Sequence, residues 1–163
     1  MGGLIGTAKK TKISDTYVRN IDEIYGKVVG QNSYVYVSGS VSNLDEDSNL
    51  TNSVVDKITY IGGGAEKKKD GLFKKYTALL NTNTLIGSKH EKSSVSNCYT
   101  EKYSGLQTGV SEGCTEQDKV TLASASKLSY NVWCKNTTDD SPVLIEQTFS
   151  NSPLLINTDN AKT

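Results

Sequence analysis

The sequence has little of the chemistry that most enzymes and nucleic-acid-binding proteins use. It contains a single histidine, His90, and Arg19 is its only arginine. Positive and negative side chains balance at 18 each, so no net field attracts the chain to nucleic acid or to an acidic membrane. With one arginine, the chain has almost none of the guanidinium groups that form paired hydrogen bonds with phosphates and base edges. We therefore expect no nucleic-acid partner.

Long apolar runs are absent as well. No stretch approaches the roughly 18 consecutive apolar residues of a membrane span. The first residues, MGGLIGTAKKTK, place a short apolar part before the charges, unlike a secretory signal. Gly2 follows Met1, but Gly6 stands where the myristoylation pattern has Ser or Thr. The sequence predicts no membrane span, no signal peptide, and a flexible arm over residues 1–12 that orders on a neighbouring subunit.

The cysteines give no metal or redox motif. Cys98, Cys114 and Cys134 are widely and unequally spaced, without a C-x-x-C pair. Structural zinc sites usually take their ligands in close pairs from a turn, which disfavours a site built from His90 and the three thiols. We expect buried reduced thiols or one disulfide.

What the chain does contain is polar, strand-forming material. Ser, Thr and Asn make up about 30% of the residues, and nine tyrosines outnumber two phenylalanines and one tryptophan. Such residues suit turns and half-exposed strands, and tyrosine suits surfaces that bind partners.

Local patterns predict two helices. Over residues 13–29, apolar side chains recur at helical spacing, and over residues 65–80 a second apolar face follows the glycines at 62–64. The run 43–52 reads as a polar loop. The remaining apolar segments read as strands, with the first two forming a hairpin across that loop; they cover residues 33–42, 54–61, 120–122, 128–134, 143–149 and 154–156, with short strands and loops over 81–117.

Many short strands, at most two helices and no regular strand-helix alternation favour a mainly β fold. We expect a single antiparallel sandwich or barrel-like domain with one or two short helices. No internal repeat of fixed period is visible. The domain should cover residues 13–156, followed by a disordered tail over residues 157–163.

One segment matches a catalytic pattern. Gly109-Val110-Ser111-Glu112-Gly113 fits the G-x-S-x-G nucleophile elbow. The elbow requires a strand before it, a helix after it, and a histidine later in the chain, whereas His90 precedes Ser111. We interpret the segment as a glycine-bounded turn and expect no enzyme.

An acidic loop carries the only candidate metal site. Oxygen-bearing side chains occur at positions one, three, five, nine and twelve of a twelve-residue segment, the spacing of a calcium-binding loop. Leu50 replaces the glycine of that loop and an aspartate replaces its final glutamate, so an acidic strand connection explains the segment equally. The candidate ligands are Asp45, Asp47, Asn49, Ser53 and Asp56.

Together these observations favour a non-enzymatic structural assembly subunit. The leading example is a virion protein of the capsid, decoration or tail type, in a virion or an extracellular assembly. Its partners would be copies of itself or other structural proteins. Two alternatives stay open: a β-sandwich binding module for carbohydrate or protein, ordered by calcium at the Asp45 loop, and an enzyme using dispersed carboxylates.

Overall fold

The computed structural model describes residues 1–29, 34–66, 79–105, 107, 109 and 112–145, and these residues form strands without any α-helix. None of them belongs to a helix long and apolar enough to cross a membrane. The strands are β1 (Ile5–Ala8), β2 (Lys12–Val29), β3 (Tyr34–Ser38), β4 (Val41–Leu44), β5 (Asn49–Glu66), β6 (Leu79–Asn83), β7 (Ile86–Lys89), β8 (Ser94–Ser96), β9 (Cys98–Glu101), β10 (Cys114–Gln117), β11 (Trp133–Lys135) and β12 (Pro142–Leu144).

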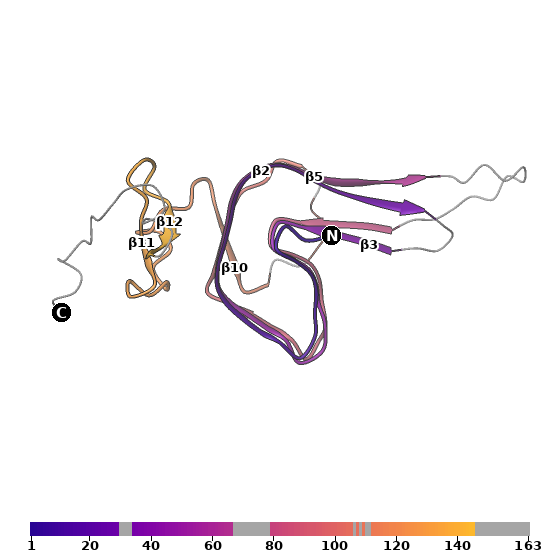
Figure 1. Cartoon of the computed structure of the whole chain (residues 1–163), viewed down its shortest axis with the longest axis horizontal. Helices are drawn as coiled ribbons and strands as arrows, with labels where there is room; N and C mark the ends of the chain where they lie inside the picture. Colours follow the sequence, from indigo (N-terminus) through magenta and orange to yellow (C-terminus); the bar gives the residue numbers. More distant parts are fainter. Residues whose placement is uncertain (30–33, 67–78, 106, 108, 110–111, 146–163) are drawn as a thin grey trace, which may run out of the picture. The chain divides into compact units, whose positions relative to one another are not determined.

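The first of two structural units, Met1–Val120, is a stack of parallel coils. Coil 1 covers residues 1–29, coil 2 covers 34–66, and coil 3 covers 79–103. Each coil lays its strands in parallel on those of the coil before it, giving the orders β1-β4-β7, β2-β5-β9-β10 and β3-β6, with β8 also on β5. In Figure 1 the coils follow nearly the same path, one behind another.

The registers reveal an internal repeat. Lys12 lies opposite Asn49, 37 residues later, and Asn49 lies opposite Ser94, 45 residues later. The segments 12–21, 49–58 and 94–103 are therefore copies of one pattern. They read KISDTYVRNI, NLTNSVVDKI and SVSNCYTEKY, with an apolar second residue, Ser or Thr third, and Asp or Asn fourth.

Left-handed residues make the corners of the coils. Asp15, Asn52 and Asn97 occupy the same corner with φ near +50°, and the Asn97 amide donates a hydrogen bond to the Asn52 side chain at 3.3 Å. Lys10 and Asp47 form the preceding corner in the same way. Asn and Asp tolerate left-handed backbone better than other residues except glycine. This explains why all three copies have Asp or Asn at the corner of Asp15, Asn52 and Asn97.

At the Lys10 corner, glycine should improve stability. Lys10 has a φ of 51°, a conformation that costs a lysine about 1–2 kcal/mol. Glycine avoids this cost but loses about 0.5–1 kcal/mol more backbone entropy on folding. We therefore expect Lys10→Gly to raise the free energy of unfolding by about 0.5 kcal/mol in urea denaturation. Lys12→Gly, at an exposed position inside β2, is the matched control and should lower it by a similar amount. Equal effects of the two substitutions would contradict the corner assignment.

The interior of the stack consists of columns of apolar side chains, one from each coil. Ile13 and Leu50 form one column with Val95, and Val18 and Val55 form another. A third corner lies at Asn20 and Lys57, which also have left-handed backbone. Beyond it, the ends of β2 and β5 pack on β3 and β6 through a second cluster centred on Ile24, Val37 and Ile61. Because every column needs the next coil to cover it, the coils stabilise one another.

The second unit, Thr121–Thr163, contains the only antiparallel pair among the described strands, β11 with β12. Trp133 is completely buried, and Leu122, Ala125, Leu128 and Val143 are also buried.

The mainly β prediction is confirmed, but the antiparallel sandwich or barrel is not what forms: all described strand pairs of the first unit are parallel. The helix over 13–29 is wrong, because these residues form β2. The left-handed corners at Asp15 and Asn20 shift the alternation of side chains, so Ile13, Val18, Ile21 and Ile24 all face inward at near-helical spacing.

The predicted strands are confirmed only in part. The strands over 33–42 and 54–61 are confirmed in outline as β3, β4 and part of β5, but they form no hairpin with each other, since each pairs with another coil. Short strands over 81–117 are confirmed. Residues 120–122 form no strand, and β11 is shorter than predicted. Most of the predicted helix over 65–80 lies outside the described residues.

The first residues of the chain belong to coil 1. Residues of the expected N-terminal arm lie in coil 1, where Ile5–Ala8 forms β1 and Gly2 bridges to Ser38 of β3. The strand predicted at 154–156 and the tail over 157–163 lie outside the described residues.

Candidate functional site

The five predicted calcium ligands are distributed along coil 2. Asp45 and Asp47 lie at the corner between β4 and β5, while Asn49, Ser53 and Asp56 follow along β5. Four of them already contact another coil: Asp45 lies 3.4 Å from the Lys9 ammonium, and the side chains of Asn49, Ser53 and Asp56 contact Ser94, Thr16 and Arg19. The described residues contain no group of three or more His, Cys, Asp or Glu placed to hold a metal. Calcium binding here stays a prediction.

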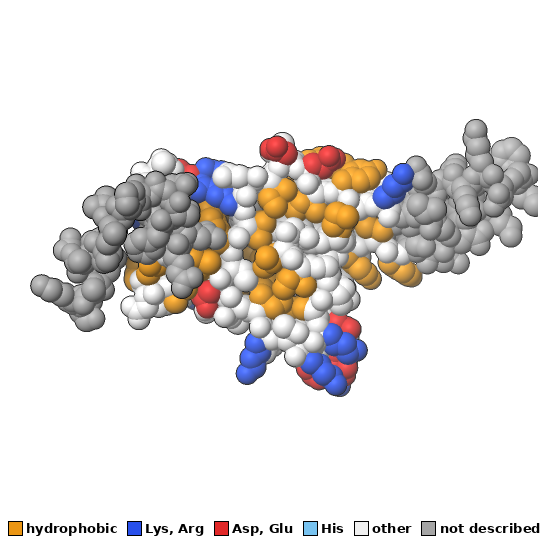
Figure 2. Space-filling view, viewed as in Figure 1, with side chains coloured by type: hydrophobic (Ala, Val, Ile, Leu, Met, Phe, Trp, Pro, Cys, Tyr) orange, Lys and Arg blue, Asp and Glu red, His pale blue; other side chains and the backbone are white. Residues whose placement is uncertain are grey.

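The Asp45 corner is a surface network of opposite charges. A hydrogen bond from the Glu46 N–H, assisted by Lys9, holds the pKa of the Asp45 carboxyl below its usual value. Glu46 pairs with Lys9 at 3.7 Å and with Lys92 at 3.4 Å, which joins all three coils. Figure 2 shows basic and acidic side chains gathered at the lower tip of the stack. Exposed pairs of this kind contribute little stability each.

The thiols of the first unit lie next to each other in the interior. Cys98 is opposite Cys114 on the neighbouring strand, and the Cys114 sulfur lies 3.5 Å from the Thr100 hydroxyl. Burial raises the pKa of Cys114 to about 12 and also raises the pKa of Cys98. Both are free thiols and stay protonated at neutral pH, which makes them poor nucleophiles.

His90 lies at the corner after β7, where its Nδ1 accepts a hydrogen bond from the Lys92 N–H at 3.2 Å. The predicted turn at 109–113 is described only in part, and Ser111 lies outside the described residues. Gly113 has a φ of 76°, as a glycine-bounded turn requires.

A row of charged residues crosses the coils at one register position. Arg19 lies opposite Asp56, with 3.3 Å between the guanidinium Nε and the carboxylate, and Glu101 holds the equivalent position in coil 3. Asp56 is only 1% exposed. Burial raises the pKa of Asp56 to about 6; Arg19 opposes this shift, and the charge of Glu101 adds to it.

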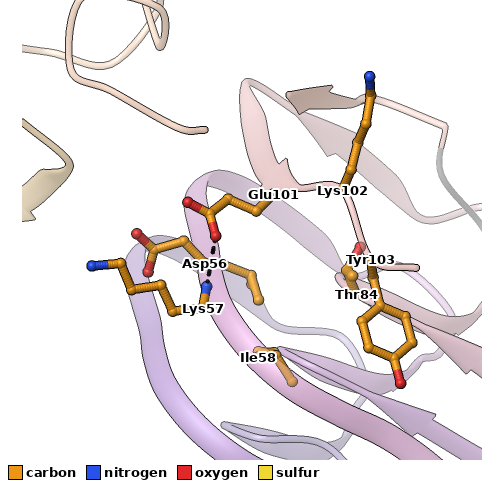
Figure 3. A pocket seen from close by; sticks show the side chains of 8 residues that line it. Asp56, Lys57, Ile58, Thr84, Glu101, Lys102 and Tyr103 are labelled. Carbon is orange, nitrogen blue, oxygen red and sulfur yellow. Dashed lines mark hydrogen bonds between the residues drawn. The ribbon is translucent and has the colours of Figure 1, made fainter. Parts of the chain in front are cut away.

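A small cavity lies beside this row (Figure 3). Asp56, Lys57 and Ile58 line it from β5, opposite Glu101 and Tyr103, and its volume is about 30 Å³. The backbone N–H of Lys57 donates to the Glu101 carboxylate at 3.1 Å, so this carboxylate of coil 3 binds the backbone of coil 2. A space this small holds one water molecule, not a substrate.

The two edges of the coil stack differ. On the coil 3 side of β5, the Tyr103 hydroxyl accepts a hydrogen bond from the Ile61 N–H at 2.8 Å and lies 3.2 Å from the Ile61 carbonyl. The side chain therefore replaces a pairing strand. On the opposite side, β1 and β2 are the terminal strands of their sheets, and no described strand pairs with their outer edge.

We call this outer edge of Ile5–Ala8 and Lys12–Val29 the coil 1 edge. Both backbone groups of Thr11 face coil 2: its N–H donates to Ser48 Oγ at 3.2 Å and its carbonyl accepts from the Asn49 N–H at 2.9 Å. Since alternate residues of a strand direct these groups to opposite sides, the N–H groups of Lys12 and Ser14 point outward. Sequence reasoning missed this edge because it read the segment as a helix.

Comparison with known proteins adds no assignment. No family model, no curated protein and no solved structure matches this chain.

Proposed function

We propose that this protein is a non-enzymatic structural subunit that assembles by strand pairing at the coil 1 edge, as a component of a virion or another extracellular assembly. The observation that carries the proposal is the coil 1 edge itself: two strands, one of them 18 residues long, end their sheets without a described partner strand. Proteins usually shorten, cover or charge such edges, because an open edge recruits another strand.

The partner is a second copy of this chain. Its formal net charge is zero, so copies do not repel one another at long range. The coil 1 edges of two copies also have strands of equal length, with their corners at equal spacing. The thiols of Cys98 and Cys114, which burial keeps protonated at neutral pH, fit a structural role better than a nucleophilic one.

The proposal predicts that proline at Ser14 weakens assembly. Proline removes the outward N–H and places its ring where the partner strand would bind, while an edge position inside one chain tolerates it. We expect the wild type to associate with rising concentration in sedimentation equilibrium, and Ser14→Pro to weaken association by at least about tenfold.

Ser14→Ala, which keeps the N–H, is the matched control and should assemble normally. Far-UV circular dichroism verifies that each variant folds, and Lys12→Pro tests the same edge if Ser14→Pro does not. A wild type that stays monomeric at millimolar concentration, or a folded proline variant that assembles like the wild type, would refute the proposal.

A further inference from the structure

Two of the three thiols lie on adjacent strands at one end of the five-stranded sheet. Cys98 is the first residue of β9 and Cys114 the first of β10, and the two are register partners in this parallel pair. Register partners in a parallel pair direct their side chains to the same face of the sheet. Both side chains accordingly pack on the interior cluster of the coils, Cys98 as a buried member and Cys114 as a partly buried one.

The backbone before β10 lies so close to coil 3 that only glycine fits there. A Cβ added to Gly113 would lie 2.1 Å from the Val95 carbonyl oxygen, and the φ of Gly113 is 76°. Four consecutive register pairs then hold β10 to β9, and beyond them the Lys102 N–H donates to the Gln117 carbonyl at 2.8 Å. The first residue of β10 is therefore fixed beside the first residue of β9.

The spacing of the two cysteines suits a disulfide. Adjacent strands lie about 4.8 Å apart, within the range of roughly 4.4–6.8 Å between Cα atoms in which disulfides form. Neither sulfur has a strong partner to give up: Cys98 Sγ lies 3.3 Å from the Ser96 carbonyl oxygen, and Cys114 Sγ lies 3.5 Å from the Thr100 hydroxyl. Because a thiol is a weak hydrogen-bonding group, turning the two side chains toward each other costs little.

We infer that Cys98 and Cys114 form a reversible disulfide that fastens β10 to coil 3, with a low-molecular-weight disulfide as the oxidant. Cys114 reacts first, because Cys98 is completely buried. Its thiolate attacks one sulfur of the oxidant, and the other sulfur leaves and takes up a proton. The Cys98 thiolate then displaces the remaining half of the oxidant as a second thiol. The protein loses two protons and two electrons, and the small disulfide gains them.

The bond is strained and therefore easily reduced. The Cβ atoms of register partners stand about as far apart as their strands, whereas a relaxed disulfide joins Cβ atoms roughly 3.5–4.5 Å apart. A strained disulfide has a more oxidising potential, so reduced glutathione opens it again. The inference does not depend on assembly at the coil 1 edge, because β10 and β2 lie at opposite ends of the sheet.

Oxidation of the folded full chain with oxidised glutathione tests the inference. Cys134→Ser removes the third thiol, and mildly alkaline buffer offsets the raised pKa of Cys98 and Cys114. We expect the intact mass to fall by two hydrogens, a peptide map to join the segments that carry Cys98 and Cys114, and reduced glutathione to reverse both changes. Amide hydrogen exchange across residues 114–117 should slow at least about tenfold on oxidation.

Cys114→Ser combined with Thr115→Cys is the matched control. It moves the thiol by one residue to the outer face of β10, where Thr115 is exposed, so no disulfide with Cys98 should form. The inference is overturned if the parent keeps both thiols or only takes up glutathione, if the control pairs as readily, if exchange across β10 is unchanged, or if reduced glutathione leaves the bond intact. Should the control fail to fold, the mass and exchange measurements on the parent decide alone.

Discussion

Replacing Leu50 by alanine should cost the first unit about 3–5 kcal/mol of unfolding free energy, the largest effect of any substitution considered. Leu50 is fully buried, and it stands in the middle coil between Ile13 and Val95. Its loss opens a cavity that neither neighbouring coil can fill, because both are fixed by parallel strand pairing. Urea denaturation followed by far-UV circular dichroism measures the effect.

Thr59→Ala is the matched control, since Thr59 lies in the same strand with its side chain exposed. Its effect should stay within about 0.5 kcal/mol. The column also predicts coupling: in a double-mutant cycle, Leu50→Ala and Val95→Ala should deviate from additivity by at least about 0.5 kcal/mol. A cost below about 1 kcal/mol for Leu50→Ala, or strict additivity, would show that the interior is not built from columns.

The β-rich character of the chain followed from its composition, but its architecture did not. The repeat was overlooked because its two spacings differ, 37 residues between coils 1 and 2 and 45 between coils 2 and 3. A search at one fixed period cannot align the three segments. The signal that would have found them is local: a left-handed Asp or Asn preceded by Ser or Thr and an apolar residue, at Asp15, Asn52 and Asn97.

The candidate site was predictable only where it depended on residue type. The sequence singled out the acids of coil 2 as calcium ligands, and this stays a prediction; the structure gives Asp45 and Asp56 partners on another coil. It gave no sign that Arg19, Asp56 and Glu101 form one row, because their proximity depends on register.

Stability of the first unit should fall as the pH rises from about 4 to about 6, because of Asp56. An aspartate in the unfolded chain has a pKa of about 3.9, whereas burial raises that of folded Asp56 to about 6. Between these values the folded state binds more protons than the unfolded state, so raising the pH favours unfolding. The two-unit difference corresponds to about 3 kcal/mol, fully present below pH 4 and lost above pH 6.

Asp56→Asn keeps the shape of the protonated side chain and cannot ionise. We expect it to lack this decline, so that urea denaturation at several pH values gives curves for wild type and variant that diverge between pH 4 and 6. Asp118→Asn is the control: Asp118 is exposed, and its pKa is lowered by Lys102, so its contribution has the opposite sign and is lost as the pH falls. Parallel curves for wild type and Asp56→Asn would mean that Arg19 compensates the buried charge fully, and that the row holds the coils together at every pH.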